Sequence, residues 1–89
     1  MPWSIAPIGK QIQKKLDELG VSERRKYDEW AGRITGQNEH PATSAQSLGY
    51  EIKKLGGTQW ELMVGSRARV SYSVDTGNTL VTLVGVGHT

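Results

Sequence analysis

Three stretches in the last third of the chain decide the fold: residues 59–64 (QWELMV), 67–75 (RARVSYSVD) and 79–86 (TLVTLVGV). Apolar and polar residues alternate in the first two stretches, and the third is rich in β-branched residues, as half-buried strands require. The connecting residues, 65–66 (GS) and 75–78 (DTGN), are typical of tight turns. The sequence therefore predicts an antiparallel meander of three strands.

Two amphipathic helices are predicted before the meander. Residues 8–19 place isoleucine and leucine at spacings of four and three, and Gly20 follows as a helix end. Residues 21–34 form the second helix, with Tyr27 and Trp30 on its apolar face. The short connection between them indicates a helical hairpin.

The remaining segments are less regular. Residues 1–8 predict a short strand, and their prolines suit an edge position. Residues 35–47 (TGQNEHPATSAQS) predict a loop, with a short helical turn after Pro41 as the alternative, and 48–55 form a short element before two glycines. We expect one α+β domain over residues 1–89, with a helical hairpin packed on a small antiparallel sheet made of the N-terminal strand and the meander.

Composition limits the possible functions. The 89 residues include no cysteine, which excludes disulfides, a thiolate zinc site and a cysteine nucleophile, and we expect neither a metal ion nor a cofactor. Eleven lysines and arginines against nine acids give a formal net charge of +2, which is compatible with nucleic acid. No apolar run approaches the roughly 20 residues that cross a bilayer, and the first residues do not resemble a signal peptide. We expect a cytoplasmic protein without membrane contact.

The order of motifs from residue 48 onward resembles the RelE/ParE/HigB toxin superfamily of type II toxin–antitoxin systems. The resemblance rests on residues 48–57 (LGYEIKKLGG), 60–62 (WEL), 69–75 (RVSYSVD) and 84–88 (VGVGH). It implies a RelE/ParE-like fold, a cognate antitoxin as partner, and cleavage of messenger RNA on the ribosome by a metal-independent endoribonuclease. Two alternatives stay open: non-enzymatic inhibition of DNA gyrase, as in the ParE branch, and a degenerate toxin fold that serves as a protein-binding module.

Metal-free RNA cleavage needs a base for the 2′-hydroxyl proton, an acid for the leaving 5′-oxygen and cations for the charged phosphorane. Arg69 matches the strand arginine of the family, and Arg67, two residues away, is expected on the same face. The guanidinium fork suits phosphate oxygens. The alternative is that these arginines only solvate an outward strand face. Tyr72 falls on the opposite, apolar face and is expected in the core.

The other candidate site residues come from the same resemblance. His88 matches a histidine or basic residue at the end of the last strand, and its side chain titrates near neutrality. Lys53 and Lys54 match lysines that help to bind RNA. The alternatives are a frayed chain end for the histidine and a solvated surface for the lysines.

Two features depart from the family pattern. Met63 follows the WEL motif where the family usually has arginine, and the sequence ends at Thr89 where many members continue with a basic residue and a tyrosine. These departures leave three alternatives: a slow nuclease, a naturally degenerate member, or a sequence that has been cut short.

Overall fold

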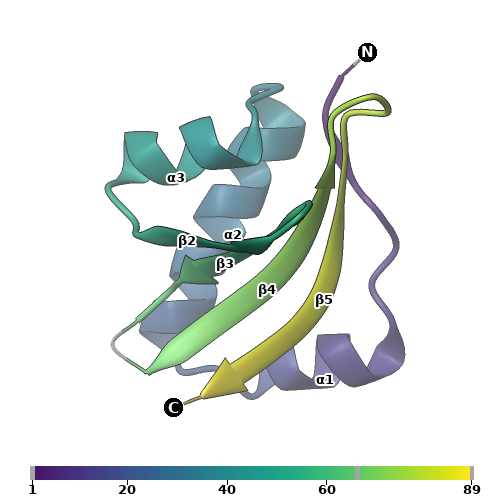
Figure 1. The fold of residues 1–89 in the computed structure, drawn as a ribbon. Helices are drawn as coiled ribbons and strands as arrows, with labels where there is room; N and C mark the ends of the chain where they lie inside the picture. Colours follow the sequence, from purple (N-terminus) through teal and green to yellow (C-terminus); the bar gives the residue numbers. More distant parts are fainter. Residues whose placement is uncertain (1, 66, 89) are drawn as a thin grey trace.

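The computed structural model describes residues 2–65 and 67–88. Within these residues, three helices pack on one face of a five-stranded sheet (Figure 1). The helices are α1 (Lys10–Asp17), α2 (Val21–Gly36) and α3 (Pro41–Leu48), and the strands are β1 (Ser4–Ile5), β2 (Ile52–Gly56), β3 (Gln59–Met63), β4 (Ala68–Asp75) and β5 (Leu80–His88). The predicted α+β class is confirmed. No helix in the described part of the chain is long and apolar enough to cross a membrane.

The sheet has the order β1-β5-β4-β3-β2 and differs from the prediction in two ways. The meander has a fourth strand, β2, which pairs with β3. The alternation of apolar and polar residues did not reveal β2, because Ile52 is the one residue of this strand that is not exposed. The sheet is also mixed, since β1 pairs with β5 in parallel, through Ser4 with Leu80 and Ile5 with Val81.

Residues 41–48, predicted mainly as loop, form α3. Pro41 occupies the first turn, where proline is tolerated, and the His40 Nδ1 accepts a hydrogen bond from the Ala42 N–H at 3.0 Å. Gly49 ends the helix with φ 77°. The helix carries no apolar stripe because, of its buried residues Pro41, Ser44 and Ala45, the last two are small.

The core lies between α2 and the central strands. Trp30 is fully buried, and its ring centroid lies 4.9 Å from that of Tyr72 on β4. Burial raises the pKa of the Tyr72 phenol to about 12. Tyr72 therefore belongs to the core, as its place in the alternation predicts.

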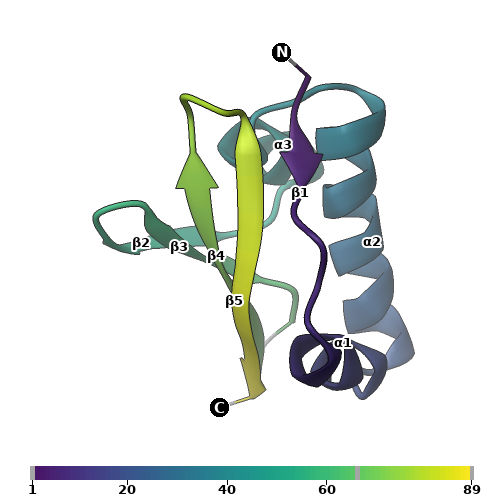
Figure 2. The ribbon, with the colours of Figure 1, turned by 90° about the vertical axis from the view of Figure 1, so that its right-hand side faces the viewer.

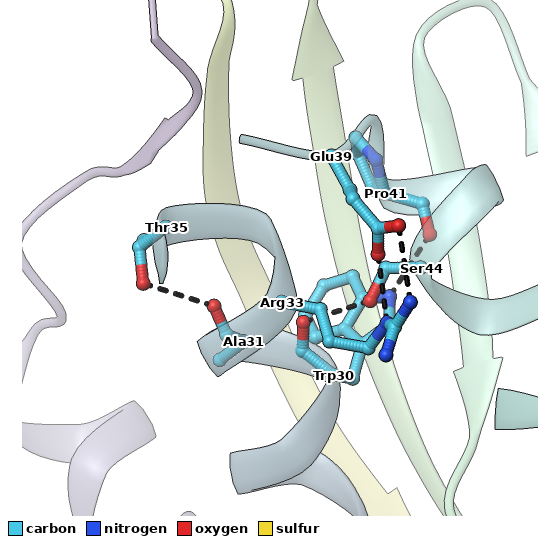
Figure 3. Close-up of polar contacts among 7 residues, drawn as sticks. All are labelled: Trp30, Ala31, Arg33, Thr35, Glu39, Pro41 and Ser44. Carbon is cyan, nitrogen blue, oxygen red and sulfur yellow. Dashed lines mark hydrogen bonds and ion pairs between the residues drawn. The ribbon is translucent and has the colours of Figure 1, made fainter. Parts of the chain in front are cut away.

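Polar contacts join α2 to α3 (Figure 3). The Trp30 indole Nε1 donates to the Pro41 carbonyl at 3.1 Å, and the Ser44 hydroxyl donates to the Trp30 carbonyl at 2.9 Å. The Arg33 guanidinium grips both carboxylate oxygens of Glu39, at 2.8 and 3.1 Å. The two bonds that involve Trp30 satisfy buried polar groups that would otherwise oppose its burial.

Candidate functional site

The helices cover one face of the sheet, and no other element of residues 2–65 and 67–88 covers the opposite face (Figure 2). In β4 every second residue, from Ala68 to Val74, is buried under the helices, whereas Arg69, Ser71 and Ser73 between them are partly exposed. These three side chains therefore lie on the uncovered side, which we call the open face. Hydroxyl and guanidinium groups on a surface without a protein cover are available to a polar ligand.

The strand register places further residues on the open face. Residues directly opposite in a ladder share a face of the sheet. Arg69 lies opposite Met63 of β3 and Gly87 of β5, so its direct partner in β5 has no side chain. Ser71 lies between Glu61 and Gly85.

A bulge in β5 shapes the same surface. The register shifts by one residue between Ser71 and Tyr72, so that Val84 is the extra residue of β5. Val84 is 49% exposed, although valine is usually buried in a strand. The bulge keeps Leu83 and Val86 in the core.

An ion pair lies on the open face, near the end of the sheet at which β4 begins and β5 ends. The Arg69 Nη1 lies 3.2 Å from the Glu61 Oε1, with side-chain exposures of 36% and 12%. Among the described residues, Glu61 is the charged residue that falls in the buried class, at 9% exposed. A carboxylate so far removed from water is retained only where a cation compensates its charge.

Glu61 was not among the predicted site residues. The sequence alone gives little reason to select Glu61, because a polar residue between two apolar residues is common in any strand with one solvent-exposed face. What distinguishes it is its burial beside Arg69, which depends on β3 being an interior strand with β2 on its far side.

The structure separates the two predicted lysines. Lys53 lies opposite Glu61 and so shares the open face. Lys54 lies opposite Trp60, and its Nζ is 5.8 Å from the centroid of that ring. Since Trp60 packs against the core, Lys54 lies on the helix side of the sheet edge and does not join Arg69.

The other two predicted residues lie at the same end of the sheet as Arg69. Arg67 is exposed and precedes the first residue of β4, so strand alternation does not fix the direction of its side chain. His88 closes β5, where its backbone pairs with Ala68, and its side chain lies outside the described part of the structure.

Tyr50 belongs to a different surface. Its hydroxyl donates to the Glu29 carboxylate of α2 at 3.0 Å, and the Lys26 Nζ lies 5.8 Å from its ring centroid. Burial, followed by the hydrogen bond to Glu29, raises the pKa of the Tyr50 phenol. The phenol is therefore held neutral on the helix side, away from the Arg69–Glu61 pair.

Comparison with known proteins locates the fold. No family model matches the sequence, and no curated protein matches it either. Among solved structures, a chain of the archaeal RelE–RelB complex from Pyrococcus horikoshii is similar, with a TM-score of 0.70, 21% identity, and coverage of 99% of this chain and 96% of that one. A chain of the RelBE2 toxin–antitoxin complex from Mycobacterium tuberculosis has a TM-score of 0.64 and 16% identity, and both chains are covered completely. The chain therefore has, over its whole length, the fold found in these RelE-type complexes.

Proposed function

We propose that this protein is the toxin of a type II toxin–antitoxin pair and that its open face cleaves messenger RNA on the ribosome, in the cytoplasm. The observation that carries the proposal is the Arg69–Glu61 pair, a buried carboxylate and a guanidinium on the face that the helices leave uncovered. Both similar structures come from toxin–antitoxin complexes, which supports an antitoxin partner.

The pair supplies two of the groups that RNA cleavage needs. The Glu61 carboxylate accepts the proton of the 2′-hydroxyl, and the 2′-oxygen attacks the adjacent phosphorus. Arg69 swings from Glu61 onto the phosphate oxygens and stabilises the negative charge of the phosphorane. The bond to the 5′-oxygen then breaks, which leaves a 2′,3′-cyclic phosphate and a free 5′-hydroxyl.

The leaving 5′-oxygen needs a proton, and we assign this acid to His88, whose backbone closes β5 one residue after the partner of Arg69. Lys53 on the open face and Arg67 before β4 add positive charge for the RNA backbone. Lys54 has a smaller part, because Trp60 holds it on the other side of the sheet edge.

The test is to induce the protein alone and to follow incorporation of labelled methionine and thymidine. Early loss of methionine incorporation with DNA synthesis intact supports messenger-RNA cleavage, and Arg69→Ala should abolish that loss while the protein stays folded. Early loss of thymidine incorporation would instead indicate DNA gyrase as the target. No effect on either would favour a protein-binding module.

A further inference from the structure

A cavity of about 110 Å³ lies between α1 and the end of β5. It is lined by Lys15, Glu18, Val86 and Gly87. β1 pairs only with Leu80 and Val81, so α1, and not another strand, borders β5 beyond them (Figure 2). The cavity therefore opens beside the outer edge of β5, at residues that pair with no other strand in the described part of the chain on that side.

Gly87 connects this cavity to the Arg69–Glu61 pair. It lines the cavity and also lies opposite Arg69 in the β4–β5 ladder, where neighbouring strands are about 4.8 Å apart. A Cβ atom placed on Gly87 would meet nothing within 4 Å. The surface between the cavity and Arg69 is therefore open, and an extended ligand can pass from one to the other.

The helix that borders the cavity carries an excess of positive charge, and Lys15 brings part of it to the cavity wall. Helix α1 carries Lys10, Lys14 and Lys15, and its one acid, Asp17, is bound by Arg24 at 2.7 Å. The Arg24 hydrogen bond lowers the pKa of Asp17, so that carboxylate stays ionised and engaged. Glu18, the residue that caps α1, lines the cavity together with Lys15 and reduces the attraction of that lysine for an anion.

The size of the cavity limits what enters it. Sites for whole small molecules occupy roughly 300–1,000 Å³. A cavity of about 110 Å³ is smaller than this and suits one small group, such as a phosphate with its water.

From this geometry we infer that the α1–β5 cavity is a second phosphate subsite, in which Lys15 holds a backbone phosphate of the RNA strand whose scissile phosphate lies at Arg69. The inference rests on the proposed function, because it assumes that RNA crosses the open face. It assigns α1 a direct part in substrate binding and gives the path of the RNA strand over the surface, from Arg69 on β4 past Gly87 to Lys15 on α1.

The experiment measures affinity for a single-stranded RNA oligonucleotide that carries 2′-O-methyl groups throughout and so cannot be cleaved. Lys15→Gln should weaken binding roughly fivefold at low salt and reduce the salt slope by about 0.7, the value for one phosphate contact on a single strand. Lys15→Arg should retain the affinity. Lys10→Gln is the matched control, since it removes the same charge from the same helix but does not line the cavity.

Two further variants test the cavity itself. Glu18→Gln should tighten binding, because it removes the acid that opposes the phosphate. Gly87→Val should weaken binding by closing the passage, and the space around Gly87 has room for the added Cβ atom. Replacing single phosphates by neutral methylphosphonates should reveal one position at which Lys15→Gln has no further effect.

The outcomes separate this inference from the proposed function. If Arg69→Ala weakens RNA binding but Lys15→Gln behaves as Lys10→Gln does, the subsite is wrong and the proposed function stands. If neither Arg69→Ala nor Lys15→Gln changes RNA binding, both are wrong. If Lys15→Gln weakens only the binding of a protein partner, the cavity is a protein contact and the subsite is again overturned.

Discussion

Arg69 and Glu61 form an ion pair of 3.2 Å across two neighbouring strands, on the sheet face opposite the helices. The two residues are diagonal in the ladder, because Arg69 lies opposite Met63 and Glu61 lies opposite Ser71. The guanidinium thus leans toward β3 and leaves the surface beside Gly87 open. In the proposed function, an incoming phosphate competes with Glu61 for Arg69 and leaves the carboxylate of Glu61 close to the substrate.

The first prediction concerns activity. Glu61→Gln should lower kcat for RNA cleavage by about 10²- to 10⁴-fold, since it removes the base but keeps the shape of the side chain. Arg69→Ala should lower kcat by about 10²- to 10³-fold, since it removes the cation that stabilises the phosphorane. Both are measured by the cleavage rate of a messenger RNA on programmed ribosomes.

Gln59→Ala is the matched control. Gln59 is an exposed residue of β3, two residues before Glu61, and lies opposite Ser73. It should leave the cleavage rate within about threefold, as expected of a side chain outside the reaction. Full activity in a folded Glu61→Gln variant would remove Glu61 from the mechanism.

The sequence predicted most of the sheet because alternation reports burial directly. The segment RARVSYSVD places valine and tyrosine under the helices in the structure as it does in the pattern. The pattern overextended at one end, because β4 begins at Ala68 and leaves Arg67 in the connection. The alternation of apolar and polar residues predicts the direction of a side chain only where the strand is paired, and the sequence does not show at which residue the pairing begins.

The features that the sequence did not reveal depend on long-range pairing. The two faces of Lys53 and Lys54 follow from the register of β2 on β3, which no local pattern specifies. Helix α3 is hidden because Ser44 and Ala45 are buried without being large or apolar enough to form a stripe. The burial of Glu61 needs a neighbouring strand on each side, and β2 was not predicted as a strand.

The second prediction concerns the contact between α2 and α3 (Figure 3). Ser44→Ala should lower the free energy of unfolding by about 1 kcal/mol, because it removes a buried hydrogen bond to the Trp30 carbonyl. Thr35→Ala removes a similar bond, to the Ala31 carbonyl, but at an exposed position of α2. That control should change stability by less than about 0.5 kcal/mol, as surface substitutions do. Urea unfolding measures both, and equal losses would show that burial of Ser44 is not the cause.

The third prediction concerns alkaline pH. Because burial raises the folded-state pKa of Tyr72 from 10.0 to about 12, the folded state favours the protonated phenol. Its contribution is complete below pH 10 and is lost as the pH rises through about 12, and it amounts to roughly 3 kcal/mol. Stability measured against pH should therefore fall over this interval, and Tyr72→Phe should flatten the fall. A smaller decline should remain, since the pKa values of Tyr27 and Tyr50 are also raised by burial. An unchanged profile in Tyr72→Phe would contradict the assignment.

The fourth prediction compares two glycines that lie in opposite backbone conformations. Gly49 ends α3 with φ 77°, where an L side chain costs about 1–2 kcal/mol, so Gly49→Ala should destabilise the protein by that amount. Gly32 lies within α2 at an exposed position, and a Cβ atom there would meet nothing within 4 Å. Gly32→Ala should therefore stabilise the protein by about 0.5–1 kcal/mol, since alanine loses less backbone entropy in a helix. Thermal unfolding of the two variants checks both signs. If Gly49→Ala proved as stable as the parent protein, α3 would not end in the left-handed turn that leads the chain from the helix layer into β2.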